Sequence, residues 1–321
     1  MPADRLDREP TMTPPTLPRV ATRLRVATLA LALGLAAAPA QAAPLPGQRS
    51  FASPQAAVDA LFDAVVSGDR RELRPLFGSD AARVAPIPDD AAMADVRDAF
   101  VATWSKGHAV QPQGDGRARL LLGENGWPYP LPVVREPDGR WRWDTRAGLQ
   151  EMDARRIARN EYSAMSALHA YVDAQNEYAR VDRDGDGVSA YATRIASRAG
   201  RRDGLYWPSA AGEPASPFGP DVGAAALDAQ GGRPWRGYRF RILTGQGAAA
   251  RGGAQDYRID GRLLRGFAGI AVPASYGRSG VRTFVINHDN RIWSRDLGPH
   301  TRALAARIDR FDPGPGWQRE D

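Results

Sequence analysis

The sequence predicts an α+β fold of two domains behind a cleavable leader. Apolar residues fall at helical spacing from about residue 54 to 106, and strand-like runs follow as far as 143. A second helical stretch, 145–180, contains no proline and precedes a further set of strand-like runs. We therefore expect a signal peptide over 1–42, an N-terminal domain of helices plus an antiparallel sheet over 43–146, and a C-terminal domain over 147–321. The C-terminal domain is expected to pack a long helix on an antiparallel sheet.

The leader has the three parts of a secretory signal peptide. An apolar run over 26–36 ends in the small-residue pattern Ala40-Gln41-Ala42, and it is much shorter than the ~20 residues that a membrane-spanning helix needs. Three arginines precede it: Arg19, Arg23 and Arg25. We expect cleavage after Ala42, with Met12 as an alternative start, and a periplasmic or secreted mature chain without a transmembrane segment. The alternative is that this run forms a buried core helix.

The N-terminal domain is predicted from helix caps and periodicity. Ser53 caps a helix that starts at Pro54 and ends at Gly68, and Asp69 caps a short second helix. A third helix is expected over 89–106. The predicted strands are 117–123, 131–135 and 141–143.

The C-terminal domain begins with the stretch 145–180, which predicts one long helix or two abutting ones, the second capped by Asn160. A Gly/Pro-rich stretch, 199–235, is expected to be irregular. The predicted strands are 237–243, 263–272, 281–287 and 291–297. A closing helix is expected over 299–310, with Leu304 and Ile308 facing inward.

Composition excludes several classes of function. The formal net charge is +6, and Lys106 is the only lysine among 43 basic residues. The arginines mostly lie next to acidic residues, which is typical of a solvated mixed surface, so we do not expect nucleic-acid binding. There is no cysteine, which excludes disulfides, zinc-thiolate sites and thiol catalysis. No Gly-x-Ser-x-Gly, His-Glu-x-x-His or phosphate-loop motif occurs, so no catalytic residue is predicted.

One loop has the pattern of a calcium ligand set. Oxygen-bearing residues alternate through the loop and a glycine stands at its sixth position, as in calcium-binding loops. The candidate ligands are the carboxylates of Asp182, Asp184 and Asp186 and the carbonyl of Val188. Thr193 stands where such loops place a bidentate glutamate, so the predicted Ca²⁺ site is weak or takes ligands from elsewhere, for example Asp203. The alternative is an ordinary turn after a helix.

Aromatic residues beside prolines are candidates for stacking on a sugar or a peptide. These candidate ligand-binding residues are Trp127, Tyr206 and Trp207. The alternative is that their rings close the ends of a sheet or the junction between the domains.

Across nearly the whole mature chain, the sequence resembles a bacterial family of secreted proteins known only as a domain of unknown function. The resemblance is carried by the segments 51–54, 127–128, 160–161, 171–175, 202–208 and 237–243. It implies an architecture, and it implies no activity.

Two weaker resemblances concern the separate domains. Residues 160–178, 237–240, 280–284 and 289–292 resemble the helix end and sheet of type IV pilin-like globular heads, although the chain lacks the N-terminal helix and processing site of a pilin. Residues 56–77 resemble the first helical hairpin of the NTF2-like superfamily.

Together these observations predict an exported envelope protein that acts by non-catalytic binding or scaffolding. Its expected partners are other envelope proteins or cell-wall components. The alternative is a periplasmic hydrolase or a sugar- or peptide-binding protein that uses the cleft between the domains.

Overall fold

The computed structural model describes residues 43–114, 116–183, 185, 187–209, 212–219 and 234–320. These residues form helices and antiparallel sheets, which confirms the predicted α+β class. The predicted signal peptide lies outside the described residues. Buried apolar side chains gather in two clusters, which we call the first core and the second core. The first core lies within 51–143 and the second within 164–311.

The first core is built on helix α1 (Pro54–Ser67), which begins where the cap predicts. The Ser53 hydroxyl accepts a hydrogen bond from the Ala56 amide at 3.1 Å, and this satisfies an amide that has no partner within the helix. Gly68 ends the helix in the left-handed region, at φ 72°. Val58 and Leu61 lie on the buried face of α1 and pack in the first core.

Four short helices follow α1, and a longer helix comes after them. The order is η1 (Arg70–Glu72), α2 (Leu73–Phe77), η2 (Gly78–Asp80), α3 (Ala81–Val84) and α4 (Asp90–Ser105). Asp69 accepts a hydrogen bond from the Arg71 amide at 2.9 Å, and Asp89 accepts one from the Ala92 amide at 2.8 Å. Both aspartates therefore act as N-caps, and the predicted cap at Asp69 is confirmed.

A four-stranded antiparallel sheet completes the first core. Its strands are β1 (His108–Pro112), β2 (Arg117–Leu122), β3 (Trp127–Arg135) and β4 (Trp141–Trp143), in the order β1-β2-β3-β4. Strand β1 was not predicted, and β3 begins at Trp127 rather than at residue 131. The fully buried Trp143 donates its indole N–H to the Ala57 carbonyl at 3.2 Å, which ties β4 to α1.

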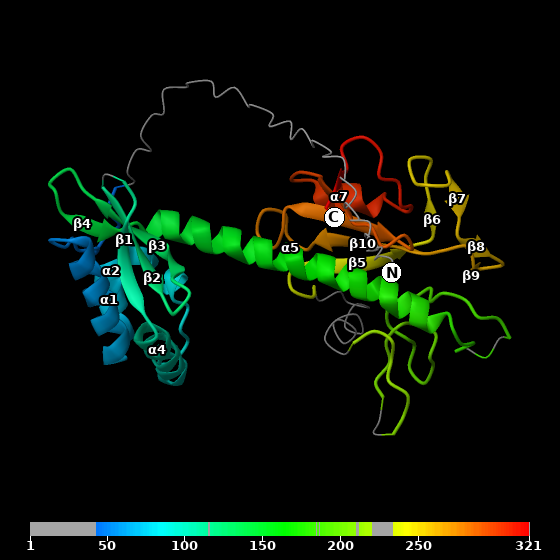
Figure 1. The fold of residues 1–321 in the computed structure, drawn as a ribbon, viewed down its shortest axis with the longest axis horizontal. Coiled ribbons are helices and arrows are strands. Elements are labelled where there is room, and N and C mark those ends of the chain that lie inside the picture. Colours follow the sequence, from blue (N-terminus) through cyan, green and yellow to red (C-terminus); the bar gives the residue numbers. More distant parts are fainter. Residues whose placement is uncertain are drawn as a thin grey trace, which may run out of the picture. The chain divides into compact units, whose positions relative to one another are not determined.

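Helix α5 (Thr145–Tyr178) is a single unbroken helix, drawn in green in Figure 1. Of the two predicted alternatives, the single long helix is therefore confirmed, and Asn160 does not cap a second helix. The Asn160 side-chain amide instead donates to the Ser279 carbonyl at 2.9 Å, and the neighbouring Glu161 carboxylate accepts the Val281 amide at 2.8 Å. These contacts fix α5 to the segment 279–281 without interrupting the helix.

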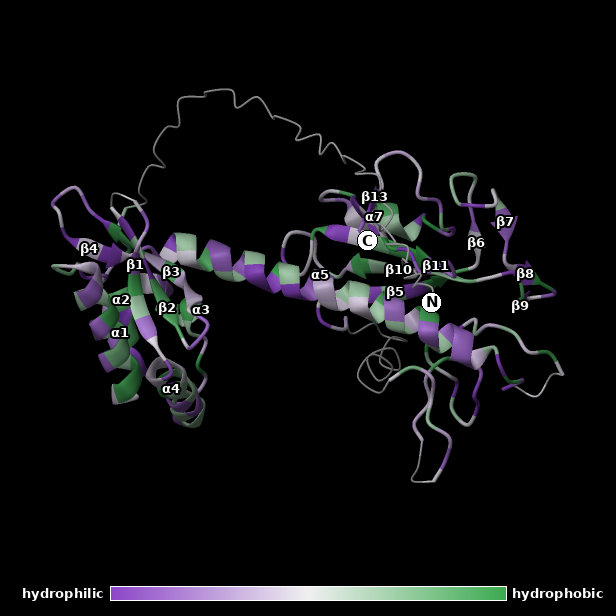
Figure 2. Cartoon of the chain, viewed as in Figure 1, coloured by the Kyte–Doolittle hydropathy of each residue, from purple (hydrophilic) through white to green (hydrophobic). Residues whose placement is uncertain are grey.

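Helix α5 contributes to the packing of both cores. Leu149 and Met152 pack against the first core, and Leu168 and Tyr171 belong to the second. The sheet of the second core is antiparallel, in the order β13-β12-β11-β10-β5. Its strands are β5 (Tyr238–Leu243), β10 (Ala268–Pro273), β11 (Arg282–Asn287), β12 (Trp293–Asp296) and β13 (Gln318–Arg319). Strands β10 and β11, which contact α5, are largely hydrophobic (Figure 2).

Smaller elements surround this sheet. Strands β6 (Gly245–Gln246) and β7 (Gln255–Asp256) form one two-stranded ribbon, and β8 (Arg258–Ile259) and β9 (Arg262–Leu263) form another. Helix α7 (Thr301–Ala306) contacts β10. It buries Thr301 and Ala305, whereas Leu304 is 41% exposed, so the prediction that Leu304 faces inward is wrong.

A search of the described helices finds none with both the length and the apolar composition needed to cross a membrane. The longest of them, α5, carries charged residues between 146 and 161 and again at 173 and 177.

Candidate functional site

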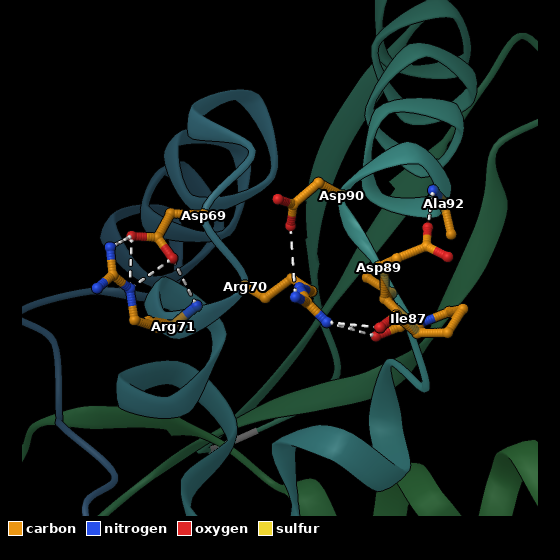
Figure 3. A network of polar contacts seen from close by, with 8 residues as sticks. Asp69, Arg70, Arg71, Ile87, Asp89, Asp90 and Ala92 are labelled. Carbon is orange, nitrogen blue, oxygen red and sulfur yellow. Dashed lines mark hydrogen bonds and ion pairs between the residues drawn. The ribbon is translucent and has the colours of Figure 1, made fainter.

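A broad hollow of about 910 Å³ lies among the short helices of the first core. Its basic side chains are largely paired. Figure 3 shows Arg70 extending toward Asp90 and the Ile87 carbonyl, at 3.3 Å and 3.1 Å respectively. Arg71 forms an ion pair with Asp69 at 2.8 Å. Hydrogen bonds from the Arg71 side chain and then from its backbone amide lower the pKa of Asp69.

These contacts connect the start of η1 to the segment before α4. Two of the three arginines that line the hollow, Arg70 and Arg71, have a carboxylate partner. We interpret these contacts as a structural polar network.

The second hollow is a cavity of about 320 Å³ beside the C-terminal end of α5, and we call it the arginine cavity. The described residues that line it come from the end of α5, from the segment 183–203 and from the β8–β9 ribbon. They are Tyr178, Arg183, Val188, Ala190, Tyr191, Ala192, Thr193, Arg194, Arg198, Asp203, Gly261 and Arg262. Four arginines therefore stand against one aspartate among these lining residues.

Arg183 is held at the end of α5. Its guanidinium donates to the Tyr178 carbonyl at 3.4 Å and lies 3.7 Å from the Glu177 carboxylate. A cation at this end of a helix satisfies carbonyls that have no amide partner and interacts favourably with the helix dipole. The same guanidinium lies 5.7 Å from the centre of the Trp207 ring. Arg183 thus contributes positive charge from a fixed position.

Asp203 and Arg198 form the ion pair of the cavity. The Asp203 carboxylate accepts the Arg198 backbone amide at 2.9 Å and the Arg198 Nε–H at 2.5 Å. Burial by itself would raise the pKa of Asp203. The hydrogen bonds from Arg198 and the charges of Arg198 and Arg194 outweigh burial, so the pKa lies below its ordinary value. Asp203 is therefore ionised at neutral pH and is committed to Arg198.

Arg194 differs from its neighbours in the cavity. Its backbone carbonyl accepts the Leu205 amide at 3.1 Å, which fixes its place in the chain. Among the residues that the structure describes, its guanidinium makes no hydrogen bond and no ion pair, and the side chain is exposed. Arg198 uses only its Nε in the pair with Asp203, so its two terminal amino groups remain for a ligand.

The cavity wall is fixed to α5 by a buried amide. Gln175, which is fully buried, donates to the Ala192 carbonyl at 2.9 Å and accepts the Ala192 amide at 2.8 Å. Its side chain also donates to the Tyr171 hydroxyl at 3.0 Å. Ala192 therefore holds a defined position, two residues before Arg194.

Two of the predicted calcium ligands, Asp182 and Val188, are among the described residues. The Asp182 carboxylate accepts the Gly185 and Gly187 amides, each at 2.8 Å, and Val188 lines the cavity. Asp184 and Asp186 lie outside the described residues. Over the part of the chain that is described, no group of three or more histidine or acidic side chains converges on one point. The calcium site stays a prediction.

The three predicted aromatic ligand residues lie in two different environments. Tyr206 and Trp207 are buried, at 9% and 4% exposed, and the Trp207 indole N–H donates to the Pro214 carbonyl at 3.3 Å. The guanidinium groups of Arg183 and Arg202 each lie 5.7 Å from the Trp207 ring centre. Tyr206 and Trp207 thus pack in the second core and do not form an exposed surface on which a ligand could stack.

Trp127 is 55% exposed, and the Arg155 guanidinium lies 4.4 Å from its ring centre. The structure places it at the start of β3, in the sheet of the first core. It does not line the arginine cavity.

Reasoning from the sequence missed the arginine cavity. Its four arginines are spread between residues 183 and 262, so no local spacing marks them as a group. The only available signal was the run of basic residues between 194 and 202, which resembles the mixed charge found elsewhere in the chain.

The fold and this cavity define an α+β protein with a basic site and no recognised catalytic arrangement among its described residues. A family described as "Protein of unknown function (DUF2950)" matches residues 48–319, and the chain belongs to this family. No curated protein and no solved structure matches the chain. The resemblances to pilin-like heads and to the NTF2-like superfamily are therefore not confirmed.

Proposed function

We propose that this chain is an exported protein of the bacterial envelope that acts by binding and not by catalysis. The observation that carries the proposal is the arginine cavity. Its described lining offers several cationic donors, whereas it contains no histidine and no second carboxylate that could activate a nucleophile. Such a lining is suited to holding an anion in place.

The export part of the proposal rests on the leader. The basic residues, the short apolar run and the Ala-x-Ala end are those of a signal peptide. The compact unit that contains both cores starts at Ala42, beside the predicted cleavage site. Every described residue of the two cores lies after this point.

The alternative of a hydrolase or a sugar-binding protein is not favoured. That alternative required Tyr206 and Trp207 to be exposed so that they could stack on a sugar ring. Both rings are buried, and Trp207 lies near two guanidinium groups. The proposed partners are accordingly anionic components of the envelope or the cell wall, or other envelope proteins.

The leader can be tested by fractionation of cells and N-terminal sequencing of the native protein. We expect the protein in the periplasm or the medium, beginning at Ala43. Ala42→Arg places a large charged residue at a position that signal cleavage requires to be small, so we expect the uncleaved chain to accumulate. Gln41→Arg is the matched control, because the middle residue of the Ala-x-Ala pattern is unrestricted.

A native protein that began at Met1 or Met12 and stayed in the soluble cell interior would refute the export proposal. Normal cleavage of the Ala42→Arg variant would refute the predicted cleavage site.

A further inference from the structure

We propose that strand β1, the outer strand of the sheet in the first core, pairs with the same strand of a second copy of this chain. The two sheets then join edge to edge around a two-fold axis at Val110. The inference goes beyond the proposed function and does not depend on the compartment in which the protein acts.

The first argument is the direction of the backbone groups of β1. Just before β1, the Gly107 carbonyl accepts the Gly123 amide at 2.7 Å. Just after β1, the Gln113 amide donates to the Arg117 carbonyl at 2.8 Å. Hydrogen-bonded positions alternate along an antiparallel pair, so in this register the odd-numbered positions of β1 bond to β2. The positions whose backbone groups point away from β2 are His108, Val110 and Pro112.

The second argument is that this edge is unprotected. Natural sheets commonly protect an edge by covering it or by placing charged side chains on it. At the opposite edge of the same sheet, Phe51 exchanges hydrogen bonds of 2.6 Å and 2.8 Å with Trp141 of β4. Strand β5, an edge of the sheet in the second core, carries Arg239 and Arg241. In β1, by contrast, four of the five residues are exposed, and no Asp, Glu, Lys or Arg occurs between positions 107 and 114.

The third argument is that β1 is complementary to itself. In an antiparallel pair centred on Val110, the Val110 residues of the two copies lie opposite each other and exchange two hydrogen bonds. The same register places His108 opposite Pro112, which has no amide hydrogen. The His108 amide donates to the Pro112 carbonyl at each end of the pair, which adds two bonds. Ala109 and Gln111 then lie opposite each other, and neither carries a charge that would repel an identical strand.

The fourth argument is the incomplete burial of helix α4. Trp104 of α4 stacks on His108, with 3.8 Å between the ring centres, and His108 lies opposite Leu122 of the first core. Helix α4 therefore reaches β1 on the covered face of the sheet. Of the 16 residues of α4 only Met93 is fully buried, and Val96 is 42% exposed. The two-fold axis of an antiparallel pair is perpendicular to the sheet, so both α4 helices lie on the same side of the joined sheet, where their apolar side chains can be covered further.

The test is analytical ultracentrifugation of the native protein, purified after expression of the full-length chain, over about a hundredfold range of concentration. We expect a monomer–dimer equilibrium that shifts toward the dimer as the concentration rises. A chain that stays monomeric over the whole range would overturn the proposal and would leave this edge to a strand of a different protein.

Amide hydrogen exchange checks the edge without any substitution. Exchange of the Val110 amide should slow as the dimer forms, because this amide gains a partner only in the dimer. The Ala109 amide is the internal control, since it already bonds to β2 in the monomer and should exchange at an unchanged rate. An equally fast exchange of the Val110 amide in monomer and dimer would refute pairing through β1.

Two double variants test the register. Both contain Gln111→Glu, and they differ only in Ala109→Glu or Ala109→Lys. Position 109 faces the uncharged Leu121 within the chain, so both variants should fold alike, and melting temperatures check this. Between the copies it lies opposite position 111, so Ala109→Glu opposes like charges and Ala109→Lys opposes unlike charges, twice in each dimer.

We expect the dimer of the Ala109→Glu double variant to have a dissociation constant about tenfold or more above that of the Ala109→Lys double variant. Equal dissociation constants in the two folded variants would contradict the register centred on Val110.

Discussion

Gln175 is the residue whose replacement is expected to affect both the second core and the cavity. The variant Gln175→Leu puts an apolar side chain of similar size in place of the amide and removes its three hydrogen bonds. Tyr171 retains its bond to the Ala268 carbonyl at 3.0 Å, so the loss falls mainly on the amide and carbonyl of Ala192, which is 2% exposed. An unsatisfied buried polar group costs about 1–3 kcal/mol, so two of them predict a loss of about 3 kcal/mol in the free energy of unfolding.

The measurement is unfolding by urea, followed by tryptophan fluorescence and by circular dichroism. Gln150→Leu is the matched control, because Gln150 lies on the same helix and is exposed. We expect the control to stay within about 0.5 kcal/mol of the wild type. A loss below about 1 kcal/mol would refute the reasoning that this amide fixes the cavity wall.

Three further predictions concern packing, pH and calcium. Gly148→Ala should lower the melting temperature, although alanine usually stabilises a helix, because a methyl group there would lie 2.2 Å from Cγ of Leu131. A higher melting temperature would contradict the packing described for α5. Burial raises the pKa of Tyr257 to about 12 from the ordinary 10, so its contribution to stability is complete below pH 10 and is lost as the pH rises toward 12. Unfolding measured between pH 9 and pH 12 should show this loss, and the slope should be shallower in Tyr257→Phe; an identical slope would contradict it. If the predicted calcium loop is correct, millimolar Ca²⁺ should raise the melting temperature and Asp184→Ala should abolish the shift. No shift in the wild type would remove the calcium prediction.

Most of the fold was predictable because local signals agreed with the packing. The cap at Ser53, the glycine at 68 and the apolar spacing between them all indicate the same helix, and α1 has those bounds. Strand β1 was missed because its side chains are mostly exposed and the strand is the edge of its sheet, so it carries no alternating apolar pattern. Asn160 was misinterpreted because its amide serves a tertiary contact with the Ser279 carbonyl, and no local pattern indicates that.

The site was less predictable than the fold. Tyr206 and Trp207 stand in a Gly/Pro-rich stretch, so the sequence allowed either a stacking surface or a packing role, and tertiary packing places both in the second core. The arginine cavity depends on contacts between segments up to 80 positions apart, for example those of Arg183 and Arg262. A sequence shows each of these arginines and does not show that they share one cavity.

The shared helix has a consequence for how the polypeptide can be divided or assembled. The first core receives Leu149 and Met152 from the opening turns of α5, and Gly148 lies against Leu131. A fragment that stops at residue 146 would leave that apolar surface open to water and to aggregation. During synthesis from the N-terminus, the same surface would stay uncovered until the opening of α5 had emerged, so an expression fragment of the first half should extend well into this helix.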